Sequence, residues 1–172
     1  MFGRWLTKAS VVREAEGAEQ LEATVRAELA GADEETVLVV TSIVGLLGAV
    51  AYADCDFSKQ EQERVREELA RIDGMTQSGV QAVCAALERH ILEVATVQSQ
   101  HYSRTLREFA DQELRIQVLE MLMALAAADQ VISNAETNVM RQITTALGLT
   151  QRDYNAAQAK YRDRLAVLQA GP

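Results

Sequence analysis

Acidic side chains gather in two short segments of the sequence, AYADCDFSKQE at 51–61 and AAADQVISNAE at 126–136. Hard cations such as calcium and manganese prefer carboxylate oxygens as ligands. The sequence therefore raises the hypothesis of a divalent-metal site at these segments, and its candidate ligands are Asp54, Asp56, Glu61, Asp129 and Glu136.

The EF-hand form of this hypothesis fails on spacing. If Glu61 were the twelfth residue of a calcium loop, the first and third would be Val50 and Tyr52, which carry no carboxylate. For Glu136 the corresponding residues are Leu125 and Ala127. A looser metal site stays open as an alternative to a purely structural use of the same residues.

In the structural interpretation each segment is a turn between two helices. An Asp side chain at the end of one helix can accept hydrogen bonds from backbone N–H groups of the turn. Ser58 with Glu61, and Ser133 with Glu136, have the spacing of a capping box, in which the hydroxyl and the carboxylate satisfy backbone N–H groups of the first helical turn. Both interpretations remain open on the sequence alone.

Other catalytic chemistry has little support in the sequence. His90 and His101 lack the Glu-x-x-His spacing of a di-iron bundle, so we expect a partly buried helix residue and a residue at a bend. Cys84 lies in an apolar stripe, and Cys55 lies between two carboxylates, which disfavour a thiolate. With no glycine-rich phosphate loop, we expect a protein without enzymatic activity.

Composition predicts an all-helical protein. Hydrophobic residues make up 48% of the 172 residues, and the one proline is Pro172. Nothing therefore interrupts helices from within. The 17 basic and 25 acidic side chains give a net charge of −8, which argues against nucleic acid as a partner.

The most apolar segment is TVLVVTSIVGLLGAVAYA at 36–53. A membrane span needs roughly 20 predominantly apolar residues. This segment contains Thr41, Ser42, Gly45 and Gly48, so we expect a buried core helix rather than a transmembrane one. The N-terminus lacks an apolar run of signal-peptide length, and two distant cysteines fit a reducing compartment. We therefore expect a cytoplasmic protein, with peripheral contact to a membrane as the alternative.

Helix start and stop signals divide the chain into seven to eight helices. A segment at 1–32 is expected to pack on a body at 33–172. It includes a short N-terminal helix and a helix at 11–30. In the body we expect helices at 34–52, from Ser58 to before Gly74, and from Thr76 to a bend at 101–105. Further helices are expected at 111–128, from Ser133 to Gly148, and from Thr150 onward with Tyr154, Tyr161, Leu165 and Leu168 on one face.

The two acidic segments belong to an internal repeat. Residues 53–61 read ADCDFSKQE and residues 128–136 read ADQVISNAE, so Ala, Asp, Ser and Glu coincide and Phe57 corresponds to Ile132. The period is about 75 residues and predicts two related halves, at about 34–97 and 111–168. Each half would bury its apolar faces against the other.

A helix ends in Ala-Asp, a short turn follows, and Ser-x-x-Glu opens a helix that ends at Leu-Gly-Leu-Thr. In this series of local features the chain resembles the tellurite-resistance TerB family. That family includes TerB-like domains of membrane-anchored J-domain co-chaperones. The resemblance is strongest over 113–164 and fainter over 43–87. It implies a compact all-helical domain of two related halves, a part in a bacterial stress or envelope-associated system, and no established enzymatic activity.

Family turns usually have Gly directly after the Asp, where this chain has Cys55 and Gln130. Glycine suits a turn residue with positive φ, so these residues put the turn geometry in question.

For function we expect an interaction module whose two turns present one acidic surface to a basic or membrane-associated protein. An adaptor without metal is the alternative, as is, more remotely, an enzyme of unknown reaction. Phe2 and Trp5 are expected to mediate self-association or contact with a membrane.

Overall fold

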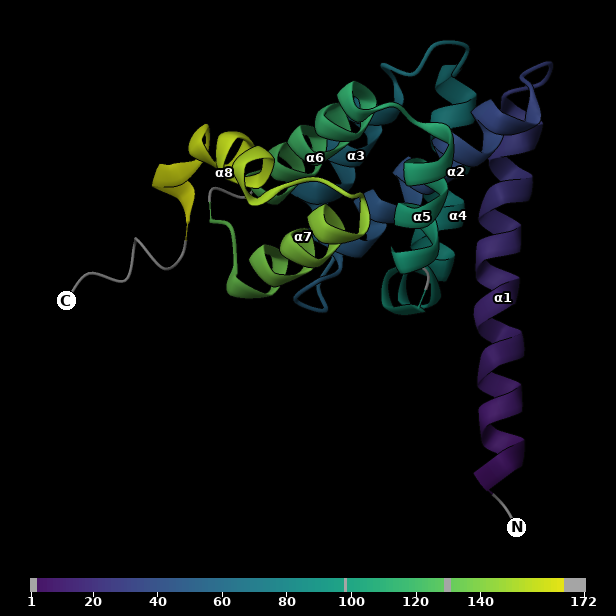
Figure 1. Ribbon diagram of the computed structural model, residues 1–172. Helices are drawn as coiled ribbons and strands as arrows, with labels where there is room; N and C mark the ends of the chain where they lie inside the picture. The colour runs from purple at the N-terminus through teal and green to yellow at the C-terminus, as the bar shows by residue number, and fades with distance from the viewer. Residues whose placement is uncertain (1–2, 98, 129–130, 166–172) are drawn as a thin grey trace.

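The computed structural model describes residues 3–97, 99–128 and 131–165, with side chains described from residue 16 onward except at 97. This part of the chain forms eight α-helices and one short 3-10 helix. They are α1 (Gly3–Glu28), α2 (Glu34–Ala51), α3 (Lys59–Leu69), α4 (Gln77–Val97), α5 (Ser99–Phe109), α6 (Gln112–Ala126), α7 (Asn134–Ala146), α8 (Gln151–Ala159) and η1 (Arg162–Arg164). The expected all-α bundle is confirmed (Figure 1).

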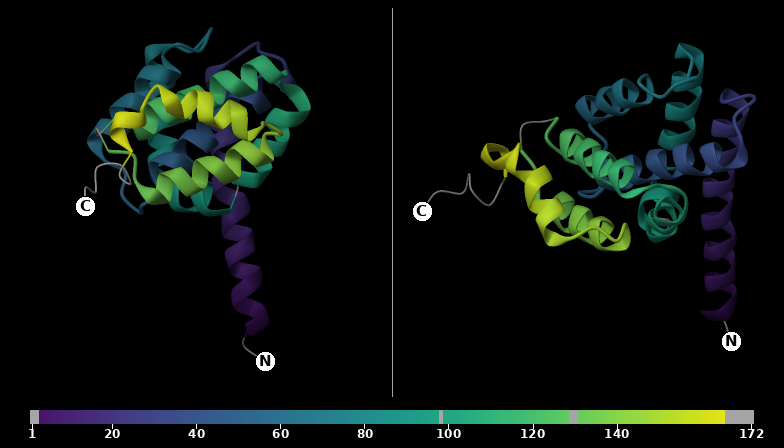
Figure 2. Two further views of the ribbon diagram at one scale, coloured as in Figure 1. Left: turned by 60° about the vertical axis from the view of Figure 1, so that its left-hand side comes forward. Right: turned by 45° about the horizontal axis from the view of Figure 1, so that its top comes forward.

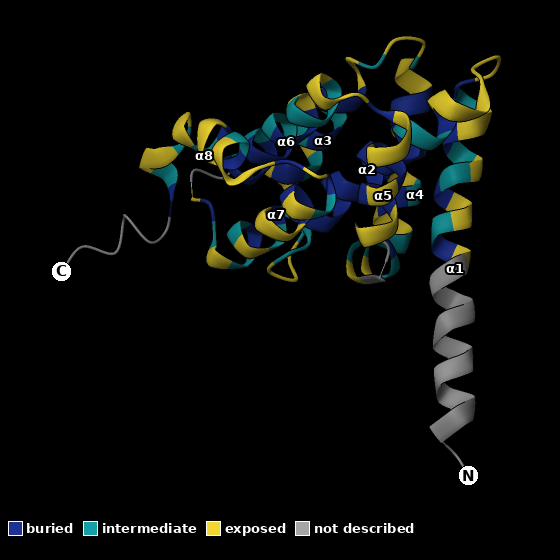
Figure 3. Cartoon of the chain, in the orientation of Figure 1, coloured by how far each residue is buried: buried dark blue, intermediate teal, exposed yellow. Residues whose placement is uncertain are grey.

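Helix α2 is the centre of the bundle. It contacts α1, α3, α4, α5, α6 and α7, and every residue from Val40 to Ala51 is buried (Figure 3). By length and hydropathy α2 could cross a membrane, but 72% of it is buried inside the protein. The expectation of a buried core helix is therefore confirmed.

Small residues on α2 let two neighbouring helices come close. A Cβ at Gly45 would overlap the ring of Tyr102 on α5, and a Cβ at Gly48 would lie 2.7 Å from Cδ1 of Leu87 on α4. Such distances are far below van der Waals contact, so these two glycines fix how closely α5 and α4 approach.

The first helix is longer than expected. In place of a short N-terminal helix and a second one at 11–30, the chain forms one continuous helix from Gly3 to Glu28. Its C-terminal part has the buried side chains of Leu21 and Val25 and packs mainly against α4, and Leu29 directly after the helix is buried as well. Figure 1 and the right-hand view of Figure 2 place α1 and α8 on opposite sides of the body.

The bend expected at 101–105 is wrong, because this segment lies inside α5. Tyr102, Ser103 and Thr105 are buried. The two hydroxyls donate to carbonyls one turn back, Ser103 to Ser99 at 2.8 Å and Thr105 to His101 at 3.2 Å. Polar residues that satisfy themselves within the helix can face the core, which is why the polar run misled the prediction.

The last helix is shorter than expected. Helix α8 ends at Ala159, and η1 carries the chain back so that Leu165 forms a β-bridge with Ile132. Tyr161 and Leu165 therefore do not continue the face of α8 that Tyr154 occupies, and Leu168 lies outside the described residues. The expected stop at a glycine is confirmed at Gly148, which follows the C-cap of α7 with a φ of 69°. Helix α3 ends earlier, at Leu69, and Gly74 takes its positive φ of 84° in the connection to α4.

The close approach of α2 and α5 gives a stability prediction. Gly45→Ala should lower the free energy of unfolding by about 1–3 kcal/mol, because its methyl group must displace the Tyr102 ring in a packed core. Thermal and urea denaturation measure the loss. In the double variant Gly45→Ala/Tyr102→Leu, the smaller side chain should make the effects non-additive, and strict additivity would contradict the proposed contact.

Candidate functional site

The turn between α2 and α3 exposes two carboxylates. Asp54 Oδ1 accepts the N–H of Asp56 at 3.0 Å, and Asp56 Oδ1 accepts the N–H of Phe57 at 3.0 Å. Both residues are exposed. The backbone of the turn thus holds one oxygen of each carboxylate, and both side chains remain accessible from outside.

Between these carboxylates Cys55 has a φ of 68°, the left-handed conformation that favours glycine. It is the one non-glycine residue with positive φ in the described part of the chain. The turn therefore keeps the geometry that a glycine would take with less strain, even though the sequence has a cysteine here. Gln130, the corresponding residue of the second turn, lies outside the described residues.

Glu61 and Glu136 do a structural task in the two halves. Glu61 Oε2 accepts the N–H of Ser58 at 2.7 Å, and the Ser58 hydroxyl accepts the N–H of Glu61 at 3.2 Å. The pair Ser133 and Glu136 repeats this with distances of 2.7 and 3.1 Å. Both capping boxes expected from the sequence are therefore present.

These two glutamates are only 6% and 4% exposed. Their carboxylates are therefore largely shielded from solvent, and a role for them as metal ligands or acidic contacts stays a prediction. Asp129 lies outside the described residues, so the joint acidic surface of both turns stays a prediction.

The described residues contain no group of three His, Cys, Asp or Glu side chains that could hold a metal ion. The structure thus does not gather the described candidates Asp54, Asp56 and Glu61 into such a group. The site expected at the second turn includes Asp129, and the metal hypothesis there stays a prediction.

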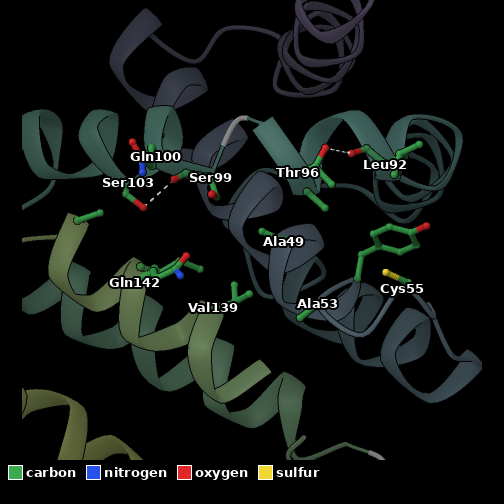
Figure 4. A pocket seen from close by; sticks show the side chains of 14 residues that line it. Ala49, Ala53, Cys55, Leu92, Thr96, Ser99, Gln100, Ser103, Val139 and Gln142 are labelled. Carbon is green, nitrogen blue, oxygen red and sulfur yellow. Dashed lines mark hydrogen bonds between the residues drawn. The ribbon is translucent and has the colours of Figure 1, made fainter. Parts of the chain in front are cut away.

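An open cleft of about 510 Å³ lies beside the first turn, between α2, α4, α5 and α7 (Figure 4). Its lining is uncharged and rich in small side chains. It includes Ala49, Tyr52, Ala53, Cys55, Leu92, Ala95, Thr96, Ser99, Gln100, Ser103, Val139, Gln142, Ile143 and Ala146. Leu92 is 59% exposed, so the cleft carries an apolar side chain accessible to a partner.

Two described residues that flank the second turn, Ala127 and Ile132, contact the C-terminal segment of the chain. Arg164 Nη1 donates to the carbonyl of Ala127 at 2.7 Å, and the N–H of Ile132 donates to the carbonyl of Arg164 at 2.7 Å. Ile132 is 1% exposed as a result of this packing. The two turns are alike in sequence but differ in what surrounds them.

The remaining candidate groups are structural or lie apart from the turn. Cys84 is buried, and burial raises the pKa of its thiol to about 11, as expected of a core cysteine. His90 is half-buried on α4, as expected. His101 is exposed within α5 rather than at a bend.

A family model described as tellurite resistance protein TerB matches residues 40–159. This range covers most of the chain and includes both turns and both capping boxes. The chain belongs to the TerB family. No curated protein and no solved structure matches it.

The match places the described features relative to the TerB family. All of α1 precedes the matched range, and Arg164 with Leu165 follows it. The continuous first helix and the early end of α8 therefore lie outside the family region or at its edge, whereas α5, where a bend was expected, lies inside it.

The cleft was not predicted from the sequence. Ala49, Ala53, Ala95 and Ala146 all contribute small side chains to it, but they lie on three helices and in the turn after α2. A sequence pattern shows where small residues occur, and it does not show that three helices bring them to one surface. The only available signal was the run of small residues before Asp54.

Relief of backbone strain at the first turn gives a second prediction. Cys55→Gly should leave stability unchanged or raise it by up to about 1 kcal/mol. Glycine removes the cost of positive φ, and its greater freedom in the unfolded chain offsets part of the gain. Cys55→Ala keeps the side-chain strain and is the matched control. Chemical denaturation that ranks the alanine variant above the glycine variant would contradict the strained geometry.

Metal titration tests the ligand hypothesis. Because Glu61 and Glu136 are already held in capping boxes, we expect millimolar calcium or manganese to leave the thermal midpoint unchanged. Any ion that prefers the native state must raise the midpoint. A rise that disappears in Asp129→Asn would establish a site at the second turn. A rise lost in Asp54→Asn would place the site at the first.

Proposed function

We propose that this protein is a non-catalytic interaction module in a tellurite-resistance or related bacterial stress system, and that the turn between α2 and α3 contacts a protein partner with a basic surface. Membership of the TerB family supports the assignment to such a system. The observation that carries the contact is the pair of exposed carboxylates, Asp54 and Asp56, at the edge of an uncharged cleft.

Charge supports a basic partner. The chain carries a net charge of −8, so it attracts positively charged surfaces at a distance. At the turn itself, each aspartate accepts a backbone N–H with Oδ1, which leaves Oδ2 for an external donor such as arginine. Carboxylates already oriented by their own backbone lose less freedom when they bind.

A contact role also fits the location of the turn. Asp54 and Asp56 lie on the surface, yet the turn is anchored on one side by the buried helix α2 and on the other by the Ser58–Glu61 capping box. Binding residues commonly lie on loops that a rigid scaffold positions in this way. The buried residues therefore hold the turn in position, and the contact itself is made by the exposed aspartates.

Affinity capture from a bacterial lysate at low salt tests the proposal. Partners retained by the wild type should be lost with Asp54→Asn/Asp56→Asn, because the amide oxygen keeps the turn hydrogen bonds but the charge is gone. The control Glu35→Gln/Glu108→Gln removes two exposed charges elsewhere and should retain the partners. An identical set of partners for both variants would contradict a contact at this turn.

A further inference from the structure

The cleft beside the first turn has a counterpart in the second half of the molecule. With the repeat period of about 75 residues, Ala49, Tyr52 and Ala53 correspond to Ala124, Ala127 and Ala128. The first three line the cleft of about 510 Å³, and the last three line a depression between α6, α3 and the C-terminal segment. The two surfaces are thus formed by equivalent helix ends.

In the second half the chain shows what this surface binds. Residues 161–165 lie across the end of α6, where the guanidinium of Arg164 donates to the Ala127 carbonyl at 2.7 Å. The next residue, Leu165, is 8% exposed and forms the β-bridge with Ile132. An arginine in a segment that is not α-helical thus occupies the equivalent place, and the leucine that follows it lies beside Ile132.

The described chain has no such segment at the first turn. Helix α4 corresponds to α8 but runs on to Val97, and α5 follows it, so both line the cleft as helices and no described non-helical segment crosses the end of α2 there. Phe57, the counterpart of the almost fully buried Ile132, is only partly buried. The last turn of α2 contains no basic residue either.

The electrostatics of the first turn favour a positive group. The C-terminal end of a helix carries partial negative charge on its unpaired carbonyls. At α2 this end is followed by the exposed carboxylates of Asp54 and Asp56, whereas the lining of the cleft is uncharged. A charged donor is therefore favoured at the rim, and an apolar side chain is favoured among the alanines of the cleft.

We propose that the cleft between α2, α4, α5 and α7 binds a non-helical segment of a partner protein in which an arginine is followed by an apolar residue. The arginine binds at the end of α2 beside Asp54 and Asp56, and the apolar side chain enters the cleft next to Leu92. This inference rests on the proposed function and specifies the chemistry of the partner that the turn recognises.

The chain supplies its own probe. A fluorescently labelled, N-acetylated peptide AKYRDRL, which corresponds to residues 159–165, should bind the full-length protein saturably at low salt. The peptide AKYRDAL, which lacks the second arginine, should bind about tenfold more weakly or worse, because hydrogen bonds to charged groups contribute about 1.5–3 kcal/mol. Fluorescence anisotropy measures both affinities.

Two protein variants locate the binding site. Ala95→Trp fills the cleft and should weaken binding of AKYRDRL about tenfold or more. Ala124→Trp places the same side chain at the equivalent surface of the second half and should leave the affinity unchanged. Equal losses in both variants, or a loss in Ala124→Trp alone, would overturn the assignment to the first cleft.

Thiol labelling tests the same site in the wild-type protein, so the proposal does not depend on whether a variant folds. Cys55 is exposed and lines the cleft, while Cys84 is buried with its pKa raised to about 11. Saturating AKYRDRL should slow alkylation of Cys55 at least several-fold and leave that of Cys84 unchanged. An unchanged rate at Cys55 would overturn the proposal.

The peptide and capture experiments test the two proposals independently. If capture depends on Asp54 and Asp56 but AKYRDRL does not bind, the interaction module remains and the assigned peptide chemistry is wrong. If the peptide protects Cys55 but capture is indifferent to both aspartates, the cleft is a binding site and the acidic contact of the proposed function is wrong.

Discussion

The packing of α2 determines the rest of this fold. A helix buried along nearly its whole length needs apolar partners on every side, and six other helices contact it. Gly45 and Gly48 leave space for the side chains of Tyr102 and Leu87, so α5 and α4 can pack closer to α2 than larger residues would allow. Without this close approach, an apolar helix of this length would expose enough surface to favour a membrane or aggregation.

The same packing explains why polar residues are found in the core. Ser42 lies on the buried part of α2 and donates to the carbonyl of Leu38 at 2.7 Å. Thr144 on α7 does the same toward Met140 at 2.7 Å. A hydroxyl that is satisfied within its own helix needs no partner on the neighbouring helix, so it can occupy a small space in the core without an unpaired polar group. Small polar residues therefore act here as small packing residues.

Local signals were sufficient to predict most helix boundaries. The Ser-x-x-Glu pairs, the Thr150–Asp153 pair and Gly148 after α7 act through the backbone within a few residues, so the sequence alone locates them. The errors arose where distant contacts decide. The helical state of 101–105 depends on Tyr102 packing against α2, and the early end of α8 depends on Leu165 reaching Ile132. For the candidate site, spacing revealed the capping boxes and the exposed aspartates, but it could not reveal the cleft.

The contrast between the two turns follows from the partners of α4 and α8. Helix α1 packs along α4 at two glycines: a Cβ at Gly17 would lie 3.3 Å from Cβ of His90, and one at Gly79 would lie 3.3 Å from Cβ of Glu28. This contact supports α4 far beyond the point equivalent to the end of α8. Helix α8 packs mainly on α6, and after Ala159 the chain turns back toward the end of α6. The long α4 leads into α5 and forms a wall of the cleft, whereas after the short α8 Arg164 contacts Ala127 and Leu165 contacts Ile132. Helix α1, which lies wholly outside the family region, thus supports the helix that forms one wall of the cleft beside the first turn, although the two halves share their turn sequence.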